Sequence, residues 1–199
     1  VTGSDFWTKV RQVSMANRHE KALIGGYWSA VDTLAHAYGP QDEMCQMEIR
    51  SLALMMDQIF LAPMASADCQ DTLLLITADH GQITTPERAA IVLPDHPDLV
   101  EGLMMAPVGE ARVPFFYVRH GHFDAVWYYL HEHFRDDFLF LTREQVIESG
   151  LLGHGEMYAE IPHRLGDIIG IAKGNRYFVR DAALAKKLRG KHGGLTPEE

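Results

Sequence analysis

The sequence has few cysteines and fewer basic than acidic residues, and it lacks a long apolar run. Only Cys45 and Cys69 are cysteines among 199 residues, and their spacing is not that of a metal-binding motif. This favours free thiols or small buried side chains over a disulfide. Lys and Arg number 18 against 27 Asp and Glu, for a net charge of −9, which argues against a surface for a nucleic-acid duplex. No run approaches the roughly 18–20 apolar residues of a membrane span.

The remaining composition is that of a globular protein of ordinary domain size. Hydrophobic residues make up 47% of the chain and charged residues 23%, which predicts a single buried core and a single domain over residues 1–199. The first residues have neither an initiating Met nor the apolar region of a signal peptide. The last four, beginning with Thr196-Pro197, have the pattern of a helix start. We therefore expect a portion of a longer protein, incomplete at both ends.

Apolar periodicity predicts alternating helices and strands, the pattern of an α/β fold. Helices are expected at residues 6–21, from Gly39-Pro40 to Pro63, at 123–134 and, capped by Thr142, at 143–148. Strands are expected at 22–28, 71–77, 113–118, 138–141, 167–172 and 177–179, with the last two forming a hairpin around Gly174-Asn175. Residues 83–112 have no clear period and predict a loop with short elements. The inward face of the second helix is expected to carry Met44, Met47, Leu52, Met55 and Ile59. The unbroken apolar run at 71–77 favours a mainly parallel sheet.

Three separated blocks place Asp and His beside Gly where predicted elements end. The first block contains Asp32 and His36, four residues apart and on one face if the segment is helical. The second is Asp79-His80-Gly81, directly after the apolar run, where the burial of a polar pair requires ligation or hydrogen bonding. The third is His192-Gly193-Gly194. Two carboxylates and three imidazoles are suitable ligands for zinc-like ions.

Together and in this order, the three blocks resemble the metal site of the alkaline phosphatase superfamily, in particular its type I phosphodiesterase/nucleotide pyrophosphatase family. Tyr27 and Gly39-Pro40, which flank the first block, also match the family pattern. The resemblance implies an alkaline-phosphatase-like α/β fold, with a mainly parallel sheet flanked by helices. It covers residues 27–192 and corresponds to the carboxyl-terminal portion of a family member.

The resemblance also implies a function and a ligand set. Asp32, His36 and His192 would hold one divalent, zinc-like ion, and Asp79 and His80 would form half of the shell of a second. The activity expected for the parent protein is hydrolysis of phosphodiester or pyrophosphate bonds in a small phosphate ester or nucleotide, through a Thr or Ser nucleophile. That nucleophile lies upstream of the first block in the family. No catalytic residue is therefore assigned in this chain, which we expect to be inactive alone and to self-associate through an exposed sheet edge.

Several other residues have competing interpretations. Thr33 and Thr77 are hydroxyls near the expected ligands, but neither occupies the position of the family nucleophile. His120 and His122, and likewise His131 and His133, are two residues apart and would diverge on a helix, which favours solvated or aromatic-packed side chains over a metal site. His154 is expected in a loop. The alternative functions are another activity of the superfamily (phosphomonoesterase, sulfatase, phosphonate hydrolase or phosphomutase) and a non-catalytic module of the same fold.

Overall fold

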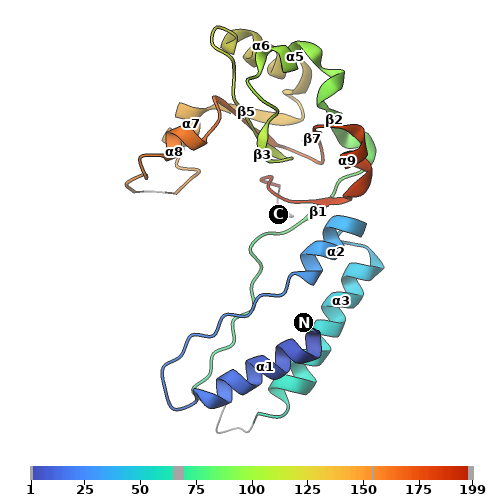
Figure 1. Ribbon diagram of the computed structural model, residues 1–199, viewed down its shortest axis with the longest axis vertical. Helices are drawn as coiled ribbons and strands as arrows, with labels where there is room; N and C mark the ends of the chain where they lie inside the picture. Colours follow the sequence, from blue (N-terminus) through green and yellow to red (C-terminus); the bar gives the residue numbers. More distant parts are fainter. Residues whose placement is uncertain (1, 65–69, 154, 197–199) are drawn as a thin grey trace. The chain divides into compact units, whose positions relative to one another are not determined.

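The computed structural model of the chain describes residues 2–64, 70–153 and 155–196. It divides into two compact units, Val1–Asp79 (unit 1) and His80–Glu199 (unit 2). Unit 1 consists of helices joined by irregular chain, and unit 2 mixes helices with strands (Figure 1). No helix within the described ranges is both long enough and apolar enough to cross a membrane.

Within its described residues, unit 1 contains three α-helices and a π-helical turn. They are α1 (Gly3–Ala16), α2 (Ala30–Tyr38), α3 (Glu43–Met55) and η1 (Met56–Leu61). Helix α1 begins where the Thr2 hydroxyl accepts a hydrogen bond from the Asp5 amide, and α3 begins where the Asp42 carboxylate accepts one from the Met44 amide. Trp7 of α1 is buried, stacks on Phe60 and donates its indole N–H to the Leu52 carbonyl. This contact ties α1 to the end of the α3–η1 segment.

The inward face predicted for the second helix is wrong in its first two turns. Met44 and Met47 are 53% and 51% exposed, whereas Cys45 is buried. Helix α2, which was not predicted as a separate helix, packs against α3. It therefore buries a different face of α3 from the one predicted. The Cys45 thiol lies 3.9 Å from the Val31 carbonyl of α2. Cys45 is a free, buried thiol, as predicted, and Cys69 lies outside the described residues.

The two strands predicted in unit 1 are absent from its described residues. Residues 22–28 and 71–77 have no strand assignment, and Leu23, Leu73 and Leu75 are 100%, 80% and 78% exposed. A strand persists only where a neighbouring backbone completes its hydrogen-bond ladder. All strands in the described part of the chain belong to unit 2. The apolar run at 71–77 therefore has strand-like composition without the strand.

Unit 2 is built on a four-stranded antiparallel sheet with the order β3-β4-β6-β5. Its strands are β3 (Val108–Glu110), β4 (Val113–Phe116), β5 (Phe138–Thr142) and β6 (Ile168–Ala172). Side chains alternate between its two faces. Phe116, Phe138 and Ile168 pack into a cluster with helix α6 (Phe123–Phe134). Ile169 and Ile171 point the other way and pack with Val146 of α7 (Arg143–Glu148).

These helices and strands confirm most sequence predictions for unit 2. Helix α6 has the predicted bounds, and α7 is capped by Thr142, whose hydroxyl accepts a hydrogen bond from the Gln145 amide. Short elements occupy residues 83–112, as expected. They are β1 (Ile83–Thr84), η2 (Glu87–Ala89), β2 (Ala90–Val92), η3 (Leu93–Asp95), α5 (Pro97–Gly102) and β3. The other short elements are α8 (Ile161–Arg164), β7 (Tyr177–Val179), α9 (Ala182–Lys187) and β8 (Gly190–Lys191).

The predicted hairpin between residues 167–172 and 177–179 is wrong. Both strands form, but β6 is flanked by β4 and β5 and has no edge left for β7. Strand β7 instead pairs in parallel with β2, and β1 pairs antiparallel with β8. The α/β class is confirmed, while the parallel arrangement is confirmed only for the β2–β7 pair.

Candidate metal centre

Asp32 and His36 lie one turn apart on helix α2. The helix ends at Gly39, whose φ of 103° is accessible to glycine and whose amide donates to the Ala35 carbonyl. Asp32 is in the first turn and His36 in the last, which suits the helix dipole. The Asp32 Oδ1 and His36 Nε2 atoms are 3.4 Å apart. The predicted shared face is therefore confirmed.

This separation matches the geometry of two ligands on one zinc ion. Ligand atoms about 2.0–2.1 Å from a tetrahedral zinc lie about 3.3 Å from each other. The side chains of Asp32 and His36 are 38% and 25% exposed, so both retain access to solvent. The donor set, one carboxylate oxygen and one imidazole nitrogen, fits a zinc-like ion.

His80 and His192 come together at one end of the β1–β8 ribbon. Ile83 of β1 pairs with Lys191 of β8, so the residues before β1 and after β8 emerge at the same end. The rings of His80 and His192 stack with centroids 3.8 Å apart and an interplanar angle of 20°. The His80 Nδ1 atom lies 3.0 Å from the Gly81 carbonyl oxygen. Two histidines separated by more than 100 residues therefore share one local site in unit 2.

Lys191 anchors the ribbon beside His192. Its side chain is 7% exposed, and its ammonium donates to the Leu188 carbonyl at 2.7 Å and to the Thr85 hydroxyl at 3.2 Å. The same nitrogen lies 3.9 Å from the centre of the Tyr177 ring. Burial lowers the pKa of Lys191 to about 8, because desolvation disfavours the charged form.

The structure therefore groups the predicted ligands into two local pairs, Asp32–His36 and His80–His192. Asp79 is exposed and directly precedes His80. Asp32, His36 and Asp79 belong to unit 1, and His80 and His192 to unit 2. Convergence of all five ligands on a pair of ions stays a prediction.

The hydroxyls considered in the sequence have local hydrogen-bond partners. Thr33 donates to the Ser29 carbonyl at the start of α2, a common arrangement for a helical threonine. Thr77 donates to the Ala78 carbonyl.

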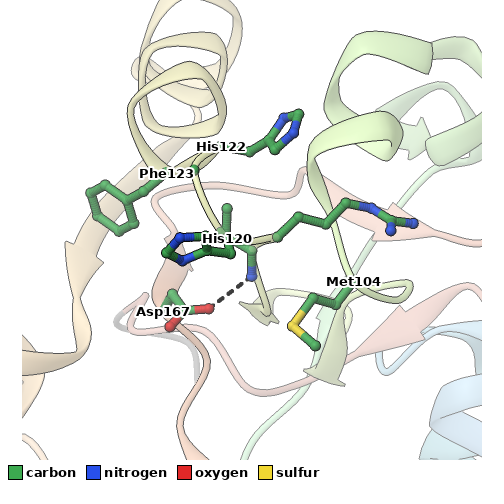
Figure 2. A pocket seen from close by; sticks show the side chains of 8 residues that line it. Met104, His120, His122, Phe123 and Asp167 are labelled. Atoms are coloured by element: carbon green, nitrogen blue, oxygen red, sulfur yellow. Dashed lines mark hydrogen bonds between the residues drawn. The ribbon is translucent and has the colours of Figure 1, made fainter.

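A separate cavity of about 670 Å³ lies where β4 leads into α6 (Figure 2). The Asp167 carboxylate in its wall accepts hydrogen bonds from the Val118 amide at 2.7 Å and from the Arg143 guanidinium at 2.6 Å. The His120 ring lies near Asp167, whereas the His122 ring points away from it (Figure 2). The cavity contains none of the five predicted ligands; its wall is formed by Met104, Val118, Arg119, His120, Gly121, His122, Phe123 and Asp167.

The histidines of α6 are packed against aromatic rings, as predicted. His131 lies 4.3 Å from the Trp127 ring centre and His133 lies 4.2 Å from that of Tyr129. His131 Nδ1 also lies 2.9 Å from the Trp127 carbonyl oxygen. His154 lies outside the described residues.

The sequence reasoning did not identify Glu110 as a neighbour of His192, nor Lys191 as a buried residue. Glu110 ends β3 and its carboxylate lies 3.8 Å from His192 Nδ1. It falls in the region without clear periodicity, more than 80 residues before its partner. The tertiary fold of unit 2 brings Glu110 to His192 over this separation, so no local pattern could have revealed their contact.

Comparisons with known proteins identify relatives of the whole chain. The type I phosphodiesterase/nucleotide pyrophosphatase family matches residues 2–195. The structure of human ectonucleotide pyrophosphatase/phosphodiesterase 5 is similar over 98% of this chain and 48% of its own, with 21% identity and a TM-score of 0.70. An inactive form of the murine protein in complex with AMP is similar over the same shares, with 19% identity and a TM-score of 0.66. No curated protein matches the sequence.

The chain thus spans about half the length of the structures that it matches. At this level of identity the similarity establishes the fold, which is the alkaline-phosphatase-like fold expected from the sequence.

Proposed function

Because this chain belongs to the type I phosphodiesterase/nucleotide pyrophosphatase family, we propose that it is the carboxyl-terminal portion of a metal-dependent hydrolase of phosphodiester or pyrophosphate bonds. The family match runs through both units, which supports assigning them to one catalytic domain. The AMP bound to the murine neighbour supports a nucleotide or a related small phosphate ester as the substrate. The parent protein carries out the reaction.

The observation that carries this proposal is the local pairing of donor groups in each unit. Asp32 and His36 present an oxygen and a nitrogen 3.4 Å apart, and His80 and His192 stack at 3.8 Å. Asp32, His36 and His192 would hold one zinc-like ion, and Asp79 and His80 would supply part of the shell of a second. Bound divalent ions polarise phosphoryl oxygens and neutralise charge that develops in phosphoryl transfer.

The residues of this chain contribute positioning and charge. Helix α2 fixes Asp32 and His36 on one face, and the β1–β8 ribbon fixes His80 next to His192. Rigid elements hold such groups more precisely than isolated loops do. The two carboxylates bring negative charge to a bound cation, and the three imidazoles bring nitrogen ligands. Bound cations make the local field positive, so a protein with a net charge of −9 can still bind a phosphate ester.

We further propose that the nucleophile lies outside these 199 residues. The chain covers 48% of the related structures, and Thr33 and Thr77 each donate a hydrogen bond to a nearby backbone carbonyl. Loss of the nucleophile in comparable enzymes lowers the rate by several powers of ten. The chain alone should therefore show no turnover above the metal-only rate.

The test is hydrolysis of the p-nitrophenyl ester of thymidine monophosphate with added zinc. It compares the 199-residue chain with a version extended toward the amino terminus, and with the same extended version carrying His36→Ala. The extended protein should turn over the ester, and the variant should lose that activity. Zinc-dependent turnover by the 199 residues alone would place the nucleophile within them, and Thr33→Val and Thr77→Val would then identify it. An extended protein that is inactive with zinc on this ester and on dinucleotide substrates would contradict the proposed function.

A further inference from the structure

The cavity at the start of α6 is bordered by three basic side chains from one short segment. Arg119, His120 and His122 all contribute to its wall (Figure 2). Within the described ranges, none of these three side chains takes part in a hydrogen bond, an ion pair or a ring contact. A guanidinium and two imidazoles around one cavity, in a chain with a net charge of −9, form a local site for a negatively charged ligand.

Backbone hydrogen bonds fix the segment that carries these side chains. The Arg119 amide donates to the Gly102 carbonyl at 2.8 Å, and the His122 amide donates to the Arg119 carbonyl at 3.0 Å. Gly121, which lies between the two histidines, has a φ of 81°, as the third residue of a type II turn requires. A defined turn therefore holds the three basic residues in the cavity wall.

The carboxylate in the cavity wall already has partners that compensate its charge. Asp167 accepts hydrogen bonds from the Arg143 guanidinium at 2.6 Å and from the Val118 amide at 2.7 Å. A charge-assisted pair of this kind offsets most of the negative charge of the carboxylate. The positive charge of Arg119 is therefore not cancelled by Asp167, and the cavity remains favourable for an anion.

Apolar side chains form another part of the wall. Met104 and Phe123 line the cavity and are 65% and 38% exposed, and they lie on opposite sides of the His120 ring (Figure 2). The cavity volume of about 670 Å³ is within the range of about 300–1,000 Å³ that is usual for small-molecule sites. This volume leaves room for an apolar or aromatic group beside an anionic one.

Helix α6 begins at the edge of the same cavity and adds backbone donors to these side chains. His122 is its N-cap residue and makes no capping hydrogen bond with its side chain. The amides of the first turn, which include the lining residue Phe123, have no partner inside the helix. They act in the same direction as Arg119 on a bound anion.

We propose that this cavity binds a small aromatic phosphate ester. Arg119 and His120 donate hydrogen bonds to its phosphoryl oxygens, and Met104 and Phe123 contact its aromatic group. An imidazole has an N–H donor in its neutral and in its charged form. A guanidinium, an imidazole and a helix start offer donors from several directions, which suits a tetrahedral phosphoryl group better than a planar carboxylate. None of the five predicted metal ligands lines the cavity, so the site does not depend on the proposed function.

The first experiment titrates the 199-residue chain with phenyl phosphate in the presence of a chelator for divalent ions. In ¹H–¹⁵N correlation spectra, the amide signals of Gly121, His122 and Phe123 should shift and saturate. Inorganic phosphate and phenol, which each carry one part of the ligand, and benzoate should all bind more weakly than phenyl phosphate. No saturable shift in this segment would overturn the proposal. Equally tight binding of benzoate would refute the phosphoryl group, and equally tight binding of inorganic phosphate would refute the aromatic contact.

The second experiment repeats the phenyl phosphate titration with variants. Arg119→Gln should weaken binding by about 10-fold or more, because it removes hydrogen bonds between two charged groups, and His120→Leu should also weaken it. Arg88→Gln, which removes an exposed guanidinium of η2, is the matched control and should bind like the wild type. Equal affinity in the wild type and in Arg119→Gln, or an equal loss in Arg88→Gln, would refute the assignment to this cavity. Both experiments are free of divalent metal, so their failure would leave the proposed hydrolase function intact.

Discussion

Replacement of Lys191 by methionine should change how the stability of unit 2 depends on pH. Lys191 is 7% exposed, and burial lowers its pKa from 10.5 to about 8. A shift of roughly 2.5 units corresponds to about 3 kcal/mol of unfavourable free energy for the buried ammonium at neutral pH. The hydrogen bonds to Leu188 and Thr85 and the contact with Tyr177 offset part of this unfavourable free energy, which explains why a lysine is tolerated there.

The sign of the pH dependence follows from the direction of the shift. Between about pH 8 and 10.5 the unfolded chain still binds the Lys191 proton while the folded chain has released it, so stability rises with pH in this window. From pH 7 to pH 9.5 the wild-type chain should gain about 2 kcal/mol relative to Lys191→Met, which has no proton to release. Other titrating groups are common to both proteins and cancel in the difference.

The assay is urea unfolding at pH 7, 8, 9 and 9.5, followed by the fluorescence of Trp127. The other two tryptophans, Trp7 and Trp28, lie in unit 1 and are replaced by Phe in all proteins compared. Lys187→Met, at an exposed position of α9, is the matched control and should differ from the wild type by a constant amount. A wild-type minus Lys191→Met difference that is flat from pH 7 to pH 9.5, or that falls, would show that the ammonium is not desolvated as the structure indicates.

Two further predictions concern the core of unit 2 and the exposed apolar segment of unit 1. Phe178→Ala should lower the free energy of unfolding by about 3–5 kcal/mol, because this ring is 5% exposed and lies within 5.4 Å of the rings of Phe116, Phe134 and Phe138; a urea midpoint close to that of the wild type would contradict this. The chain should self-associate through residues 71–77, where Leu73, Leu75 and Ile76 are 80%, 78% and 71% exposed. Sedimentation velocity should show oligomers that dissociate in the Leu73→Ser/Leu75→Ser double variant, and a wild-type chain that is monomeric at 100 µM would refute the proposal.

Local signals were sufficient to predict much of unit 2. Helix α6 was correctly bounded because its apolar period is regular, and α7 because Thr142 and Gln145 form a capping box. Strands β5 and β6 were recognised by their apolar runs. The partner of β7 was not predicted, because the Gly174-Asn175 segment is compatible with a tight hairpin, and only the occupied edges of β6 exclude it.

Unit 1 was less predictable because its elements depend on their neighbours. Residues 71–77 have the composition of a buried strand, but a strand also needs a partner backbone. The buried face of α3 was misassigned because α2, which covers it, was not recognised as a helix. Period alone could not decide whether Cys45 or Met44 would lie inward.

The parts of the candidate site that lie within one short sequence motif could be predicted. The spacing of Asp32 and His36 implied a shared helical face, and the structure confirms it. The approach of His80 to His192 depends on the pairing of β1 with β8, and the approach of Glu110 to His192 depends on the tertiary fold of unit 2, in both cases over long sequence separations. The order of the three sequence blocks and their resemblance to the family suggested that His80 and His192 belong to one site. Nothing in the sequence suggested the contact between Glu110 and His192.

The most direct test of the proposed metal centre is the zinc content of the purified chain. Elemental analysis after equilibration with zinc and gel filtration should find one tightly held ion per chain, bound by Asp32, His36 and His192. His192→Ala should remove most of it, while His163→Ala, which replaces an exposed histidine of α8, should retain it. A zinc content that is unchanged in His192→Ala would contradict the account.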